Sequence, residues 1–294
     1  MTENLPEFVI NKIRELSAKT NESMEELVKQ YWEIYNDPWI QSDDQFKTDE
    51  DRHAYAVRVL WVKIVSQPPV EEYTIIPFGI REPRIAKSSG IAQSRIYASV
   101  QIGDKLENKV IVCRGETAKL VYDIEPFNIY KVKLANVRGL LMATSQTRFE
   151  DPRPAGVDPI KFLVKQVNAL PIKIIDAIKK PSRVDKGGYV DELDLRLIKG
   201  IVIRYNRFER NDGTKGAVYT ISDDSVTKDM VTPDGKVIPS QFTVWIPSNM
   251  LRYGEYSELA FVGTISLARD SGEPFMNAIC VIPIHPRPIE VISE

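Results

Sequence analysis

The sequence predicts a mainly β chain with a helical N-terminus, an α+β class, in which two small β-barrels are joined by a helical connector. Apolar residues recur at helical spacing in the first segment, and from residue 70 onward they follow the alternation of strands. An order of three strands, a short helix and two more strands then occurs twice. These observations predict an acidic helical head, a first barrel, a connector with a linker, and a second barrel, over residues 1–68, 70–150, 151–190 and 191–294.

The head is expected to contain three helices. Ser23 and Glu26 form a capping box in front of the second helix, Pro38 ends that helix, and Thr48 with Asp51 begins the third. Residues 1–52 hold thirteen acids against six Lys or Arg. A folded acidic unit of this kind is expected to dock a basic partner protein, and the alternative is that it folds back onto a basic surface of the same chain.

The first barrel is expected to begin with one long strand over residues 72–86, which Pro77 and Gly79 interrupt. Alternating apolar residues predict further strands at 94–102, 108–115, 128–137 and 140–150, with a short amphipathic helix over 116–126. This is the element order of the OB fold, a five-stranded barrel that binds oligonucleotides in many proteins.

The connector is expected to start with an irregular, turn-rich segment at 151–159. Asp158 can then cap a helix with Pro159 in its first turn, and helical spacing continues to Ile178 with a kink at Pro171. A flexible loop over residues 179–189 follows.

The second barrel repeats the pattern. Strands are expected at 195–210, 217–224, 242–247, 257–268 and 273–284, with a short helix or turn after the third. Gly200 lies near the middle of the first strand, where a glycine lets the strand bend around a small barrel.

The second barrel resembles the nucleic-acid-binding barrels of the replication protein A family in the segments KGIVIRYNRFERNDGTKGAVYTISDDS, FTVWIP and AFVGTISLARDSGEPFMNA. The segment INKIRELSAKTNESMEELVKQ resembles a helical unit at the front of some archaeal members, and the first barrel resembles the family through its element order. The resemblance implies a non-catalytic protein that binds single-stranded DNA during replication, repair or recombination, in the cytoplasm at the nucleoid. It also implies that the acidic head docks replication or repair proteins, with competition against DNA for the basic groove as the alternative. The chain lacks the four-cysteine zinc ribbon of some members, so the resemblance implies no zinc.

Binding of a single strand requires cations that contact phosphates and flat side chains on which bases stack. The first barrel offers Arg81, Arg84, Lys87, Arg95, Tyr97, Lys131, Lys133, Arg148 and Phe149. The second offers Arg204, Tyr205, Arg207, Phe208, Arg210, Lys215, Tyr219, Trp245 and Arg269, with core packing as the alternative role of Tyr219 and Trp245. Residues 55–149 hold fourteen Lys or Arg against eight acids, so the first barrel is expected to contribute more of the affinity.

Other classes of function find little support in the residues. The only histidines are His53 and His285, and no phosphate-binding loop, nucleophile elbow or zinc-protease motif occurs, so we expect neither an enzyme nor a cofactor. Cys113 and Cys280 do not form a zinc site and suit a reducing compartment, and no apolar run is long enough to span a membrane. Two alternatives stay open: a single-stranded RNA-binding protein and an OB-fold scaffold subunit of a larger complex.

Overall fold

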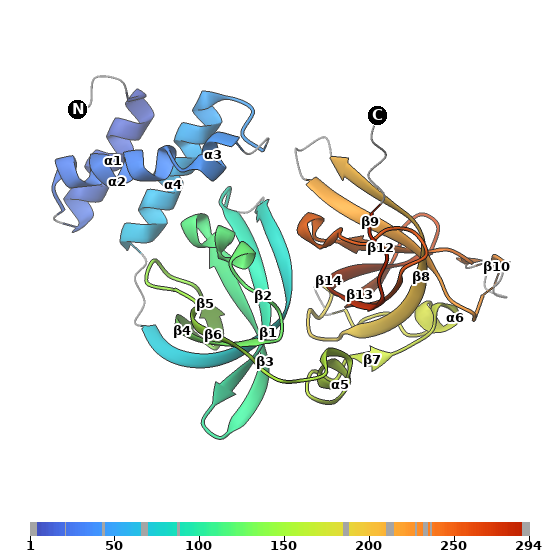
Figure 1. Ribbon diagram of the computed structural model, residues 1–294. Coiled ribbons are helices and arrows are strands. Elements are labelled where there is room, and N and C mark those ends of the chain that lie inside the picture. The colour runs from blue at the N-terminus through green and yellow to red at the C-terminus, as the bar shows by residue number, and fades with distance from the viewer. Residues whose placement is uncertain are drawn as a thin grey trace.

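The computed structural model describes residues 5–20, 22–42, 45–65, 70–86, 89–184, 188–209, 215–226, 228–231, 235 and 237–289. The chain is mainly β with a helical N-terminus, and it forms two OB-fold barrels joined by a connector (Figure 1). The helical head lies at one end of the first barrel, and the two barrels lie side by side (Figure 1).

The head contains the helices α1 (Glu7–Thr20), α2 (Met24–Tyr35), α3 (Pro38–Ser42) and α4 (Asp49–Val65). The Ser23 hydroxyl accepts from the Glu26 N–H at 3.2 Å, which is one of the two bonds of the expected capping box. Thr48 and Asp51 cap each other's backbone N–H groups at 3.1 and 3.0 Å. Pro38 is the first residue of α3, because proline is readily accommodated in the first turn of a helix.

The first barrel consists of β1 (Val70–Ile85), β2 (Ala92–Ile102), β3 (Lys105–Arg114), β4 (Asn128–Val137) and β5 (Leu140–Met142). A 3-10 helix, η1 (Gly115–Tyr122), stands between β3 and β4. The strand order β1-β2-β3-β5-β4 closes through a β1–β4 pairing, and β3 runs parallel to β5. The predicted fifth strand over 140–150 is shorter than expected. Residues 151–154, predicted to be irregular, form β6 (Glu150–Pro154) beside β4.

The second barrel has the same topology. Its strands are β8 (Arg196–Glu209), β9 (Lys215–Ser222), β12 (Phe242–Ile246), β13 (Glu258–Leu267) and β14 (Pro274–His285), with the 3-10 helix η2 (Ser248–Met250) after β12. The barrel closes through β13 and β8, and β12 runs parallel to β14. A short pair, β10 (Met230–Val231) and β11 (Val237–Ile238), lies in the connection between β9 and β12.

The connector differs from the single kinked helix that its spacing predicts. Helix α5 (Pro159–Lys165) begins as expected, with the Asp158 carboxylate accepting from the Lys161 N–H at 2.9 Å. The chain then forms β7 (Leu170–Pro171), which adds to the edge of β8, and one helical turn, α6 (Ile174–Ala177). Pro171 fits at this edge because the N–H groups that bond to β8 belong to its neighbours Leu170 and Ile172, so its own lack of an N–H costs no hydrogen bond.

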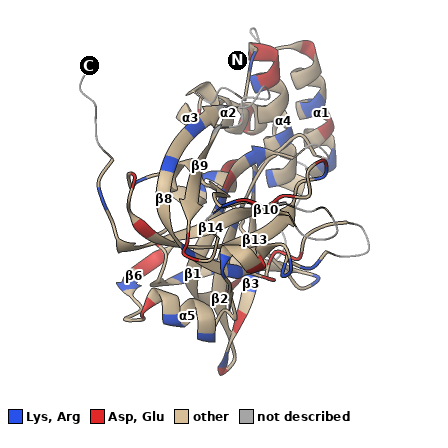
Figure 2. Ribbon diagram, turned by 90° about the vertical axis from the view of Figure 1, so that its right-hand side faces the viewer, with Lys and Arg blue, Asp and Glu red and all other residues tan. Residues whose placement is uncertain are grey.

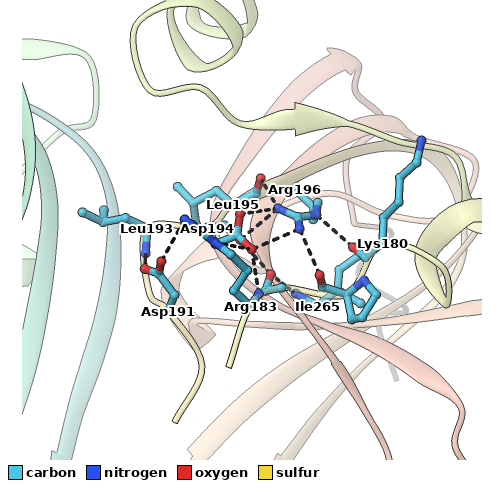
Figure 3. A network of polar contacts seen from close by, with 10 residues as sticks. Lys180, Arg183, Asp191, Leu193, Asp194, Leu195, Arg196 and Ile265 are labelled. Atoms are coloured by element: carbon cyan, nitrogen blue, oxygen red, sulfur yellow. Dashed lines mark hydrogen bonds and ion pairs between the residues drawn. The ribbon is translucent and has the colours of Figure 1, made fainter. Parts of the chain in front are cut away.

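The end of the connector is fixed to the second barrel by Arg196, which is 7% exposed (Figure 3). Its guanidinium donates to the carbonyl oxygens of Lys180 and Pro181, both at 2.9 Å, and to the Asp194 carboxylate at 2.8 and 3.1 Å. Burial alone would raise the pKa of Asp194, but the hydrogen bonds from Arg196 and from the Arg183 N–H hold it below its ordinary value.

The two barrels and the connector share a buried apolar core. Phe78 and Tyr97 from the first barrel pack in one cluster with α5 and with Ile279 of β14. Gly79 lets the backbones of β1 and β14 approach, because an added Cβ would lie 2.8 Å from the Ile279 carbonyl oxygen. Glu82 makes a second contact between the barrels, in which its carboxylate accepts from the N–H and hydroxyl of Ser248 at 2.8 and 2.6 Å.

Candidate nucleic-acid interface

A groove of about 420 Å³ runs between the two barrels. Arg81, Arg84 and Arg95 line it from β1 and β2, and Phe208, Trp245 and Asn277 line it from the second barrel. A second hollow, of about 680 Å³, continues from Trp245 and Asn277 across the outer face of the second barrel toward Arg204 and Phe275. The two hollows share residues and form one surface, which we call the inter-barrel groove.

Strand alternation places the aromatic side chains in this groove. On β12, Phe242, Val244 and Ile246 point into the barrel core, so Trp245 between them points outward and is partly exposed. Phe208 of β8 reaches across β9 and meets Trp245 edge to face, with ring centroids 4.8 Å apart.

Gly216 of β9 makes this contact possible, because an added Cβ at that position would lie 2.3 Å from the Phe208 ring. The outer face of the second barrel thus holds a pair of ordered aromatic rings on β8 and β12, the two strands that flank β9. Such rings are suited to stacking with nucleic-acid bases.

The cationic side of the groove comes from the first barrel. Arg81 and Arg95 are register partners on β1 and β2, and the Glu192 carboxylate lies 3.6 Å from the first guanidinium and 2.8 Å from the second. Each of the three side chains is between a quarter and a third exposed. Two adjacent guanidinium groups need an anion between them, and a phosphate oxygen has the charge and hydrogen-bonding capacity that Glu192 supplies here.

Tyr97 and Tyr219 correct the sequence-based expectation, because both rings are fully buried and offer no face to a base. Tyr97 points away from the core of its own barrel, as its alternation predicts, but α5 and the second barrel cover that face. Tyr219 packs in the core of the second barrel, which was the alternative to base stacking that the sequence left open. Its hydroxyl donates to the Tyr253 carbonyl at 2.9 Å.

Several other expected residues lie outside the groove. Lys131 and Lys133 are exposed on β4, and Arg148 with Phe149 lies beyond β5, where the Phe149 ring packs against Tyr130. In the second barrel, Tyr205 packs partly on the core, Arg207 is exposed on β8, and Arg269 is exposed in the turn between β13 and β14. Lys87 and Arg210 lie outside the described residues, and Lys215 is described only as a backbone position in β9.

Basic and acidic residues are interspersed over the helices and strands (Figure 2), so the charge of a segment does not by itself mark the binding face. The sequence-based reasoning missed Phe275, Asn277 and Glu192. The alternation in PFMNA contains a signal for the first two, because Met276 is buried and its neighbours therefore point outward. No comparable signal exists for Glu192, which lies in a loop.

The described part of the chain contains no candidate metal site and no reactive thiol. No group of three or more His, Cys, Asp or Glu side chains there could hold a metal ion. Cys113 and Cys280 are free thiols, and burial raises the pKa of each to about 12, which leaves them protonated and unreactive at neutral pH. None of the described helices has the length and apolar character that a membrane span requires.

No protein-family model matches this chain, and no curated protein matches it in sequence. Among solved structures, the HINa domain of Ifi202 in complex with a 20-bp double-stranded DNA is similar at 12% identity, with 73% of this chain and 97% of that chain covered and a TM-score of 0.33. The single-stranded DNA-binding protein of Thermus aquaticus is similar at 10% identity, over 77% and 98% of the two chains, with a TM-score of 0.23. A replication protein A heterotrimer bound to single-stranded DNA is similar at 7% identity, over 67% and 44%, with a TM-score of 0.39.

Proposed function

We propose that this protein binds single-stranded DNA in the inter-barrel groove, without catalysis. The observation that carries the proposal is that arginines of one barrel and aromatic rings of the other line the same groove. Phosphates of a bound strand would contact Arg81, Arg84 and Arg95, while its bases stack on Trp245 and Phe208.

The aromatic rings favour a single strand over a duplex. In a duplex the faces of the bases already stack on one another, so a protein ring cannot reach them without unstacking. A single strand presents those faces, and each stacked base contributes about 1–3 kcal/mol to binding.

The resemblance of the second barrel to the replication protein A family supports DNA as the ligand and a role in replication, repair or recombination at the nucleoid. The domain boundaries 1–68, 70–150, 151–190 and 191–294 remain part of this proposal. The shared core around Phe78 and Ile279 adds that the two barrels act as one binding unit, so that neither forms the groove alone.

Binding of a fluorescent dT oligonucleotide of about 20 nucleotides tests the proposal, since this length exceeds the ~4–16 nucleotides that one OB fold covers. We expect unlabelled single-stranded DNA to compete more strongly than RNA of the same sequence, and duplex DNA to compete weakly. Stronger competition by RNA would assign the groove to RNA, and the absence of binding would favour a scaffold role.

The acidic head is proposed to dock a basic protein and not to inhibit the groove. Leu27, Tyr31 and Val57 are buried in the head's own core, so its apolar residues fold it, and acids such as Glu25 and Glu33 remain exposed. Replacing these two acids with Gln should leave oligonucleotide affinity unchanged. A tenfold gain, equivalent to about 1.4 kcal/mol, would instead support autoinhibition.

A further inference from the structure

Asn277 occupies a position beside the main aromatic ring of the groove. It pairs with Trp245 in the parallel register of β14 and β12, and its buried neighbours Met276 and Ala278 direct its side chain to the outer face. Adjacent strands lie about 4.8 Å apart, so the amide and the indole ring emerge next to each other. Asn277 also lines both hollows of the groove.

The Asn277 side chain forms no hydrogen bond with any residue that the structure describes. Its amide therefore presents two N–H donors and one carbonyl acceptor to the groove. On the other side of Trp245 lies Phe208, which approaches across Gly216. The order across the face is thus a packing ring, a ring suited to stacking and an amide able to pair with the edge of a base.

We propose that Asn277 makes the groove selective for the base that stacks on Trp245, and that adenine is preferred over thymine. This inference rests on the proposed binding of single-stranded DNA. An asparagine amide pairs with adenine through two hydrogen bonds, in which its carbonyl accepts from the N6 amino group and its NH₂ donates to a ring nitrogen. Adenine offers an amino group beside an unprotonated ring nitrogen on two of its edges, so a stacked adenine can meet the amide in more than one orientation.

Thymine offers a poorer match. Its single N–H lies between two carbonyls and is available on one edge only, while its other edge carries a methyl group. The bases are therefore distinguished by hydrogen bonding at the amide, while stacking on Trp245 accepts either of them.

The test uses dT oligonucleotides of about 20 nucleotides in which one dA replaces one dT at successive positions. We expect one placement of dA to strengthen binding about tenfold, within the range that a bidentate pair provides. Asn277→Leu, which keeps a similar size without donors or acceptors, should remove this gain, so that the variant binds the dA-containing strand and the all-dT strand with equal affinity.

Asn206→Leu is the matched control, because Asn206 is exposed on β8 in the same row of the sheet as Trp245 but lies outside the groove. It should retain the gain from dA. Equal affinity for every dA placement, or a gain that survives in Asn277→Leu, would overturn the inference and leave the proposed function standing. If no oligonucleotide binds, the proposed function fails and the inference fails with it.

Discussion

Four arginines among the described residues line the inter-barrel groove. The number of phosphates that they contact predicts how steeply the affinity for a single strand falls as salt rises. Each phosphate contact on a single strand contributes about −0.7 to the slope of log affinity against log salt. Contacts from Arg81, Arg84, Arg95 and Arg204 together give a slope of about −2.8. Affinity should then fall about 50-fold between ~50 and ~200 mM salt.

The ion pairs with Glu192 set the lower limit of this slope. If Glu192 keeps Arg81 and Arg95 in the bound state, only two arginines contact phosphates, the slope is about −1.4, and the same change of salt weakens binding about sevenfold. We expect the steeper value, because these groups are solvent-accessible and a phosphate can replace the carboxylate.

Fluorescence anisotropy across a salt series, with paired variants, measures this slope. Arg81→Gln with Arg95→Gln should bring the slope close to −1.4, whereas Lys131→Gln with Lys133→Gln should leave it unchanged because β4 lies outside the groove. Glu192→Gln should strengthen binding at low salt by removing the competing carboxylate. A slope that responds to the lysine pair and not to the arginine pair would refute the assignment of the groove.

Three further outcomes are expected. Trp245→Ala should weaken oligonucleotide binding about 5- to 150-fold in a titration, since it removes about 1–3 kcal/mol of base stacking, and an unchanged affinity would place the bases elsewhere. Phe78→Ala should lower the free energy of unfolding in urea by about 3–5 kcal/mol, with both barrels unfolding in one transition; two separate transitions would contradict the shared core. Because the folded-state pKa of Asp194 is depressed, its contribution to stability is full above its unfolded pKa of about 3.9 and is lost as the pH falls through the lower folded value. The difference in melting temperature between the wild type and Asp194→Asn should therefore shrink below about pH 4, and a constant difference from pH 7 to pH 3 would rule out this linkage.

The strands with long alternation could be predicted from the sequence. The expected strand over 128–137 coincides with β4, because Tyr130, Val132 and Leu134 form an uninterrupted buried row. The two-residue strand β7 could not be predicted, since two residues carry no periodicity and its pairing depends on the position of β8. The two caps of the head were predicted because they depend on residues three positions apart.

The groove was only partly predictable, for a physical reason that Tyr97 illustrates. Alternation with Ile96 and Ala98 directs Tyr97 to the outer face of the first barrel. In the whole molecule this part of the face is buried, because α5 and the second barrel pack on it. Arg95 is two positions earlier on the same face, lies outside this buried contact and lines the groove. Sequence patterns identify the face of a strand, whereas the docking of one barrel on another decides which part of the face meets solvent.

The contact of Gly79 with Ile279 has a consequence for the order in which the protein gains its binding surface during synthesis. The arginines of β1 and β2 leave the ribosome before β14, which carries Asn277 and the Ile279 contact with the first barrel. Until β14 is complete, the barrel that carries Phe208 and Trp245 cannot close and pack against the first barrel. A nascent chain that lacks β14 therefore cannot form the inter-barrel groove.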